Sequence, residues 1–345
     1  MSTQKPWLTR RDWLQATSGL CLGGLSLSTQ CQSALAIPGA NSAKARIAIT
    51  LDLEMSRNFP RREDTHWDYE KGNLDEAAKK YSVAVARRVK ECGGRVHFFC
   101  VGRVLEQPDV NWLQEIAEEG HPIGNHTYDH VNVLAQSSQE LQFRFQRSPW
   151  LIEGRSLSEL IQENIRLTTS ALKQRTKIEN RGFRTPGGFT MGLSGREDLQ
   201  QMLLDLGFKW VSSLYPQHAN TDPGVKPTEA VYGSIVEALV RAQPFVYPSG
   251  LVEIPMSPIS DIGAFRTGQW KLEWFLEAIR RAIAWTIDNK ATFDFLAHPS
   301  CLGVVDPQFK SIDLIGELVT AAADAAEFVD LDQIAEVTYS QALRP

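Results

Sequence analysis

Two histidines separated by three residues, His126 and His130, are the most suggestive pair in this chain of 345 residues. At this spacing two imidazoles lie on one face of a helical turn and can bind one cation. A carboxylate from another part of the chain would complete a set of two histidines and one acid. Such a set suits Zn²⁺, and also Co²⁺, Mn²⁺ or Fe²⁺. Two solvent-facing imidazoles remain the alternative.

Two acids, Asp52 and Glu54, could supply the carboxylate, because they follow the apolar run over residues 47–51. In a strand, residues two apart point to the same face, so both acids would lie together. Carboxylates in apolar surroundings repel one another unless a cation or an arginine offsets their charge. The alternative is a pair of exposed acids, which the apolar run disfavours.

Two more polar residues follow predicted strands. Arg184 precedes a turn that holds Pro186, Gly187 and Gly188, and His298 follows the apolar segment 295–297. The proline and the glycines give a stiff turn that a ligand can approach closely. An incidental surface arginine and a structural histidine are the respective alternatives.

The elements that must position these residues alternate between strands and helices, which favours parallel βαβ units in an α/β sheet or barrel. Chemistry in such folds gathers at the carboxyl ends of the strands. The expected strands cover residues 46–53, 95–101, 122–125, 182–184, 208–213, 251–254 and 292–297. The expected helices cover residues 73–91, 111–119, 137–176, 194–206, 271–289 and 310–326. Residues 137–176 are expected to be mostly helical, with an interruption near residues 148–149 and 154. Residues 215–250 are expected to form a long excursion.

Composition excludes several classes of protein. Hydrophobic residues make up 43% and charged residues 22%, which is typical of a globular protein. The net charge of −5 argues against a nucleic-acid partner, which would favour a basic surplus. Uninterrupted apolar stretches of eighteen or more residues do not occur in the sequence, so a multi-pass membrane protein is excluded.

The first 36 residues resemble a bacterial twin-arginine export signal. Arg10 and Arg11 precede a weakly apolar run over residues 16–27, and small residues at 34–36 fit a cleavage site. Cleavage would leave a single domain, residues 37–345, in the periplasm or outside the cell without a stable membrane span. A retained membrane anchor is the alternative.

Four motifs together resemble those of the polysaccharide deacetylases, carbohydrate esterase family 4. Residues 50–54 match the first motif loosely, residues 126–130 match the second fully, residues 184–188 match the third, and residues 296–298 match the last. Their order and spacing agree from about residue 46 to residue 330. The family's remaining motif, an aspartate and a tryptophan, has no clear match, with Asp261 and Trp210 as loose candidates.

The resemblance implies a distorted (β/α) barrel, often of seven strands, that holds one divalent metal ion. Zinc is expected first, with cobalt, manganese, iron or nickel as alternatives. The family reaction removes an acetyl group from an N- or O-acetylated polysaccharide or oligosaccharide, and some members hydrolyse other amides.

The resemblance also implies roles for residues. The usual metal-binding aspartate of the first motif falls on Leu53, which cannot ligate, so Glu54 is expected to complete the metal site with His126 and His130. Asp52 is then the general base.

Four further residues complete the expected site. His298 is the general acid, and Arg184 holds the base in position. Gly187 and Pro186 contact the substrate, with the backbone N–H of Gly187 stabilising the oxyanion. Trp67 could stack on a sugar ring, or it could anchor its loop instead.

Three competing functions stay open at this stage. A small-amide hydrolase would use the same fold. A catalytically silent glycan-binding protein would explain the altered first motif. A non-haem iron oxygenase shares the ligand set, although the strand–helix pattern and the Arg-x-Pro-x-Gly turn speak against it.

Overall fold

The computed structural model describes residues 44–343, which lie within one compact unit, residues 37–345. The predicted export signal over residues 1–36 lies outside the described residues. Within residues 44–343, every helix is too short or too polar to cross a membrane.

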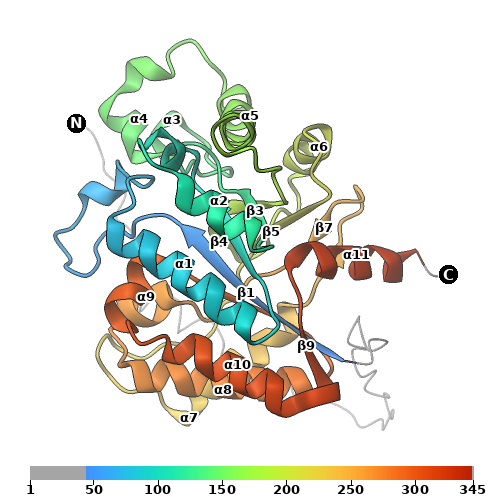
Figure 1. Ribbon diagram of the computed structural model, residues 1–345. Coiled ribbons are helices and arrows are strands. Elements are labelled where there is room, and N and C mark those ends of the chain that lie inside the picture. Colours follow the sequence, from blue (N-terminus) through green and yellow to red (C-terminus); the bar gives the residue numbers. More distant parts are fainter. Residues whose placement is uncertain (1–43, 344–345) are drawn as a thin grey trace, which may run out of the picture. The chain divides into compact units, whose positions relative to one another are not determined.

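Nine strands form a single sheet whose centre is a run of parallel strands (Figure 1). Seven neighbours, in the order β7-β5-β4-β3-β2-β1-β8, are all parallel, as expected for the distorted barrel. The strand β6 is antiparallel to β7, and β9 pairs with the start of β1. The bounds are β1 Ala45–Leu53, β2 Val96–Cys100, β3 Ile123–Asn125, β4 Phe183–Phe189, β5 Trp210–Leu214, β6 Phe245–Val246, β7 Val252–Glu253, β8 Thr292–Ala297 and β9 Ala326–Phe328.

The path of strands starts at β6 and ends at β8, so it does not close through strand pairing. Hydrogen bonds from flanking residues span this opening. The Gln243 side chain accepts from the N–H of Thr292 at 2.9 Å and donates to its carbonyl oxygen at 3.1 Å. The N–H of Ser257 donates to the carbonyl oxygen of Asp294 at 3.0 Å. These bonds hold β8 beside a residue just before β6 and the segment that follows β7.

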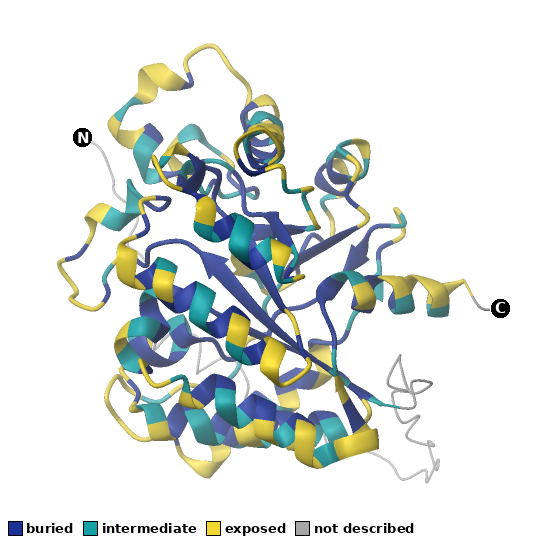
Figure 2. Cartoon of the chain, in the orientation of Figure 1, coloured by how far each residue is buried: buried dark blue, intermediate teal, exposed yellow. Residues whose placement is uncertain are grey.

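Helices lie outside the sheet and bury one face each, while their outer faces are exposed (Figures 1 and 2). The α-helices are α1 Glu76–Glu91, α2 Asn111–Glu118, α3 Ser138–Leu141, α4 Phe143–Arg147, α5 Leu157–Thr176, α6 Glu197–Asp205, α7 Glu229–Ala238, α8 Leu272–Asp288, α9 Pro299–Val305, α10 Lys310–Ala322 and α11 Leu331–Ala342. Short 3₁₀ turns occupy His66–Asp68, Gly102–Glu106, Pro149–Leu151, Leu239–Arg241 and Ala323–Ala325, and a π turn covers Ile262–Thr267.

Successive side chains along β1 point to opposite sides of the sheet. Ile47, Ile49 and Leu51 belong to the large apolar cluster that also contains buried residues of α1 and α8. Residues at the intervening positions face the barrel interior, where Thr50 and Asp52 meet polar partners from other strands. One strand therefore both anchors the core and delivers acids to the site.

An expected boundary and an expected loop differ from the structure. Helix α1 begins at Glu76 rather than at residue 73, because the Asp75 side chain accepts from the N–H of Ala78 and caps the helix. The excursion over residues 215–250 contains α7, which Thr228 caps and which buries Val231. Proline- and glycine-rich flanks conceal this helix in the sequence.

Candidate active site

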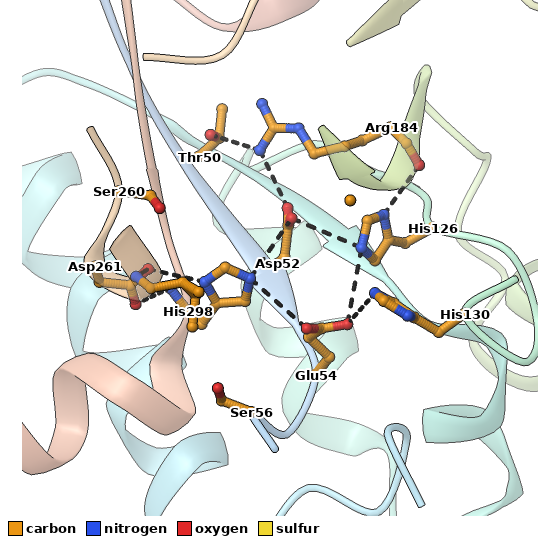
Figure 3. A network of polar contacts seen from close by, with 12 residues as sticks. Thr50, Asp52, Glu54, Ser56, His126, His130, Arg184, Ser260, Asp261 and His298 are labelled. Atoms are coloured by element: carbon orange, nitrogen blue, oxygen red, sulfur yellow. Dashed lines mark hydrogen bonds and ion pairs between the residues drawn. The ribbon is translucent and has the colours of Figure 1, made fainter. Parts of the chain in front are cut away.

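The carboxyl ends of the parallel strands surround a cleft of about 700 Å³. Its lining brings together most of the residues that the sequence singles out (Figure 3). They are Asp52, Glu54, His126, His130, Pro186, Gly187 and His298. Arg184 lies beneath the cleft and is fully buried. Four segments that are far apart in the sequence therefore meet at one place.

Glu54, His126 and His130 form a candidate metal-binding triad. One potential ligand atom from each lies within 4.8 Å of the other two. Glu54 Oε2 is 2.5 Å from His130 Nε2 and 3.9 Å from His126 Nε2. These are the two imidazoles and the one carboxylate expected from the motifs. His126 directly follows β3, His130 lies in the loop after it, and Glu54 directly follows β1.

The donor set fits a divalent cation. His126 Nδ1 lies 2.9 Å from the carbonyl oxygen of Arg184, and since a carbonyl only accepts, Nδ1 carries the proton and Nε2 presents a lone pair. Burial, partly offset by Asp52 and Glu54, lowers the pKa of His126 to about 4. Glu54 Oε2 is buried and accepts no hydrogen bond from the described residues. Potential ligand atoms of Glu54, His126 and His130 thus converge at the place where a cation would bind.

The segment from His126 to His130 is a loop, so the expected helical turn is wrong. Thr127 and His130 have φ values of 56° and 57°. Side chains fix this backbone, because Asn125 Oδ1 accepts from the N–H of Thr127 at 2.8 Å and Thr127 Oγ1 accepts from the N–H of Val131 at 2.9 Å. The two imidazole rings still converge, with centroids 5.0 Å apart.

Lys71, which the sequence reasoning missed, holds the other oxygen of Glu54. Its Nζ donates to Glu54 Oε1 at 2.7 Å, and both side chains are buried. Burial opposes ionisation of Glu54, but His130 and Lys71 together outweigh it, so the pKa of Glu54 lies well below its usual value. Oε1 is thereby committed to Lys71, while Oε2 faces the histidines.

One carboxylate oxygen of Asp52 is held by Arg184, and the other faces the cleft. Arg184 Nη1 donates to Asp52 Oδ1 at 3.1 Å and to Thr50 Oγ1 at 2.8 Å. Asp52 Oδ2 faces the cleft, 3.7 Å from His126 Nε2 and 3.9 Å from His298 Nε2 (Figure 3). This geometry suits a general base whose orientation is fixed from behind.

A second buried acid, Asp294 on β8, completes the surroundings of Arg184. It forms an ion pair with the guanidinium and accepts from Thr50 Oγ1 at 2.7 Å. Burial raises the pKa of Asp294 to about 6, against the opposing effect of Arg184. Ser212 Oγ accepts from Arg184 Nε at 3.2 Å, and the guanidinium lies 4.3 Å above the Phe99 ring. Ion pairs, hydrogen bonds and the contact with the Phe99 ring therefore fix the position of the Arg184 guanidinium.

His298 is paired with Asp261, the residue that was only a loose candidate for the missing motif. His298 Nδ1 lies 2.9 Å from Asp261 Oδ1, and the N–H of His298 donates to Asp261 Oδ2 at 2.7 Å. Burial alone would lower the pKa of His298, but Asp261, together with Glu54 and Asp52, raises it above its usual value. His298 Nε2 faces the cleft and is suited to donate a proton.

The remaining predicted residues divide into two groups. Pro186 and Gly187 line the cleft, and Gly187 has a φ of 78° with open space where a Cβ would stand. Among the described residues that line the cleft, Trp67 is absent, and its side chain packs against the large apolar cluster, which favours the role of a loop anchor. Trp210 is buried beside His97, away from the cleft lining.

Some of the missed residues left a signal in the sequence. Asp294 interrupts the apolar strand of residues 292–297, and a single acid at an inward position of a buried strand indicates a partner. Asp261 and Lys71 lie in loops, where no periodic pattern assigns their direction. Only the folded backbone places them beside His298 and Glu54.

Comparisons with known proteins support the resemblance to the polysaccharide deacetylases. Residues 71–210 match the family model described as polysaccharide deacetylase, which confirms the resemblance seen in the motifs. The match includes His126, His130 and Arg184, whereas Asp52, Glu54 and His298 lie outside it. None of the curated proteins searched matches the chain.

Solved structures share the fold at low sequence identity. A protein named as a polysaccharide deacetylase from Mycobacterium smegmatis is 18% identical, with a TM-score of 0.60 over 88% of this chain and 94% of its own. Another from Pseudomonas aeruginosa PAO1 is 12% identical, with a TM-score of 0.58 over 87% and 92%. Puue allantoinase is 14% identical, with a TM-score of 0.55 over 89% and 93%. The chain therefore has the polysaccharide deacetylase fold.

Proposed function

We propose that this chain is a metal-dependent hydrolase that removes acetyl groups from an N- or O-acetylated polysaccharide outside the cytoplasm. The observation that carries the proposal is the convergence of Glu54, His126 and His130 beside Asp52 and His298. The family match over residues 71–210 supports the class of reaction.

Glu54, His126 and His130 would hold the cation, with zinc favoured by two imidazoles and one carboxylate. A divalent ion in such a site polarises a carbonyl group and makes water more acidic. Asp52 Oδ2 accepts the proton of the attacking water, because Arg184 fixes Oδ1 and leaves Oδ2 directed into the cleft.

Collapse of the tetrahedral intermediate requires a proton on the departing amine or alkoxide. His298 supplies it from Nε2, because Asp261 occupies Nδ1 and favours the protonated ring. The backbone N–H of Gly187 contributes to stabilising the oxyanion. Loss of the base or the acid is expected to reduce turnover by about 10²–10⁴-fold.

Acetate release tests this function directly. Purified protein is assayed against N-acetylated chito-oligosaccharides and O-acetylated xylo-oligosaccharides, with and without a chelator, and its metal content is measured. Release that depends on about one divalent ion per chain supports the proposal. Asp52→Asn is expected to keep the metal and lose turnover, whereas Glu54→Gln is expected to lose both. Full activity in metal-free protein would refute the role of the cation.

Small-amide hydrolysis is the second candidate, because one structure with this fold is named an allantoinase. The same protein is assayed for opening of a cyclic ureide. Ureide hydrolysis without acetate release from any glycan would favour this function. Glycan binding by the metal-loaded protein without either activity would indicate a silent binding protein.

Export by the twin-arginine route belongs to the proposal as well. Replacing both Arg10 and Arg11 by lysine is expected to retain the protein in the bacterial cytoplasm. The measurement is fractionation of cells that express the full chain. Unchanged export of the double variant would overturn this route.

A further inference from the structure

Three arginine or lysine side chains line the cleft, and one of them has no partner. Arg57 pairs with Asp68 at 3.1 Å, and Lys71 pairs with Glu54 at 2.7 Å. The Arg266 side chain makes no hydrogen bond or ion pair with any residue in the described part of the chain. The cleft therefore presents one guanidinium whose donors are available to a ligand.

A π turn fixes the backbone that carries Arg266. The turn covers Ile262–Thr267 and begins directly after Asp261. It ends where the N–H of Gly268 donates to the carbonyl oxygen of Gly263 at 2.9 Å. Gly268 packs tightly, since a Cβ there would lie 2.7 Å from Trp270. π turns occur frequently at functional sites. This turn separates Arg266 from Asp261, the residue that pairs with the proposed general acid His298.

The surroundings of Arg266 favour an anion. Its side chain is half-buried, and burial lowers its pKa, while the Glu54 carboxylate acts in the opposite direction. A guanidinium that loses water without gaining hydrogen bonds is destabilised. A carboxylate or sulfate would restore those bonds in a planar, charge-assisted arrangement.

The position of Arg266 indicates which part of the substrate carries the anion. Asp261 is bonded to His298, which protonates the departing group, and Arg266 follows Asp261 through the π turn. Arg266 therefore lies on the side of the cleft from which the sugar departs. The acetyl group itself is placed between Asp52 and the metal triad.

We propose that Arg266 binds an anionic group, a carboxylate or a sulfate, on the sugar that is deacetylated. The inference rests on the proposed function and narrows its substrate class to acetylated acidic glycans. A neutral acetylated glycan would leave the guanidinium without a partner.

Three matched trisaccharides of N-acetylglucosamine test the proposal: the neutral form, the form oxidised to a carboxylate at C6, and the form sulfated at O6. Acetate release should favour at least one charged form over the neutral form by roughly 10- to 100-fold in kcat/KM, as expected for a charge-assisted hydrogen bond. Arg266→Gln should reduce this preference to about one, mainly through KM. Preference for the carboxylated or the sulfated form identifies the anion.

The control is Arg57→Gln, which removes a cleft arginine that already has a partner and should keep the preference. Equal activity of the wild type on all three forms, or an undiminished preference in Arg266→Gln, would overturn the inference.

Calorimetric binding of the three deacetylated trisaccharides separates this failure from failure of the proposed function. Charged forms that bind through Arg266 without any acetate release from the acetylated set would refute deacetylation and support the anion site. Deacetylation of the neutral form, with no Arg266-dependent binding of either charged form, would support deacetylation and refute the anion site.

Discussion

Replacing Arg184 by methionine should both destabilise the protein and reduce its activity. The guanidinium is fully buried and forms ion pairs with Asp52 and Asp294. Asp294 is fully buried too, and among the described residues it would keep only the Thr50 hydroxyl as a side-chain donor without Arg184. Removing one partner of a buried ion pair costs about 3–5 kcal/mol. We expect the free energy of unfolding of Arg184→Met to fall by that amount.

The assay is urea denaturation, with turnover measured on the same preparations. Asp294→Asn in the Arg184→Met background removes the uncompensated charge and should recover part of the lost stability. Turnover should stay at least about 10²-fold below wild type in both variants, because Asp52 Oδ1 has lost the donor that fixes it. Recovery of stability without recovery of turnover separates the two roles of Arg184.

The matched control is Arg196→Met, because Arg196 pairs with Asp198 at the surface. Such pairs contribute at most about 1 kcal/mol. An Arg184→Met protein as stable as the Arg196→Met control would refute the reasoning. It would mean that water reaches Asp294 and that the buried network contributes little to folding.

Three further predictions concern other parts of the site and the core. Lys71→Met leaves Glu54 without its buried cationic partner. The melting temperature should therefore fall much more in the presence of a chelator than in the presence of zinc, which would offset the charge of Glu54. Equal losses in both conditions would contradict the placement of Glu54 between Lys71 and the proposed metal ion. Asp261→Asn should lower kcat about 10- to 100-fold with little change in KM or metal content, because Asp261 acts by holding His298; a variant that loses metal instead would assign Asp261 to structure alone. Burial, partly offset by the hydrogen bond with the Arg181 carbonyl, lowers the pKa of His97 from 6.5 to about 4. The unfolded chain therefore binds this proton first, and His97 should contribute about 2–3 kcal/mol to the loss of stability as the pH drops from 6.5 towards 4. His97→Gln should flatten this part of the stability curve measured by urea denaturation, and an unchanged slope would exclude His97 as its origin.

The strand pattern could be predicted because buried parallel strands are continuous apolar runs. Strand β8 has the predicted bounds, and β1 differs by one residue. The acids at the end of β1 were also predictable, since residues two apart share a face. The placement of Asp52 and Glu54 in one cleft follows from this local geometry.

Other features depend on contacts between distant segments. The loop from His126 to His130 takes its shape from side-chain bonds of Asn125 and Thr127, and spacing alone could not distinguish it from a helical turn. Lys71 and Asp261 belong to loops whose courses are set by packing against neighbouring elements. The proposed metal ligands, base and acid could therefore be predicted from the motifs, while the partners that hold them required the fold.

The left-handed backbone at His130 restricts how the proposed metal ligands can be exchanged. With a φ of 57°, this position disfavours branched side chains and tolerates asparagine, aspartate and histidine best. Among these three, histidine and aspartate are the ones that commonly ligate zinc. A redesign towards harder cations would therefore begin with His130→Asp, whereas a thiolate introduced at the same position would have to overcome backbone strain before it could select a softer ion. The backbone conformation at residue 130 therefore limits which metal ions a redesigned site could bind, in addition to the chemistry of the side chain placed there.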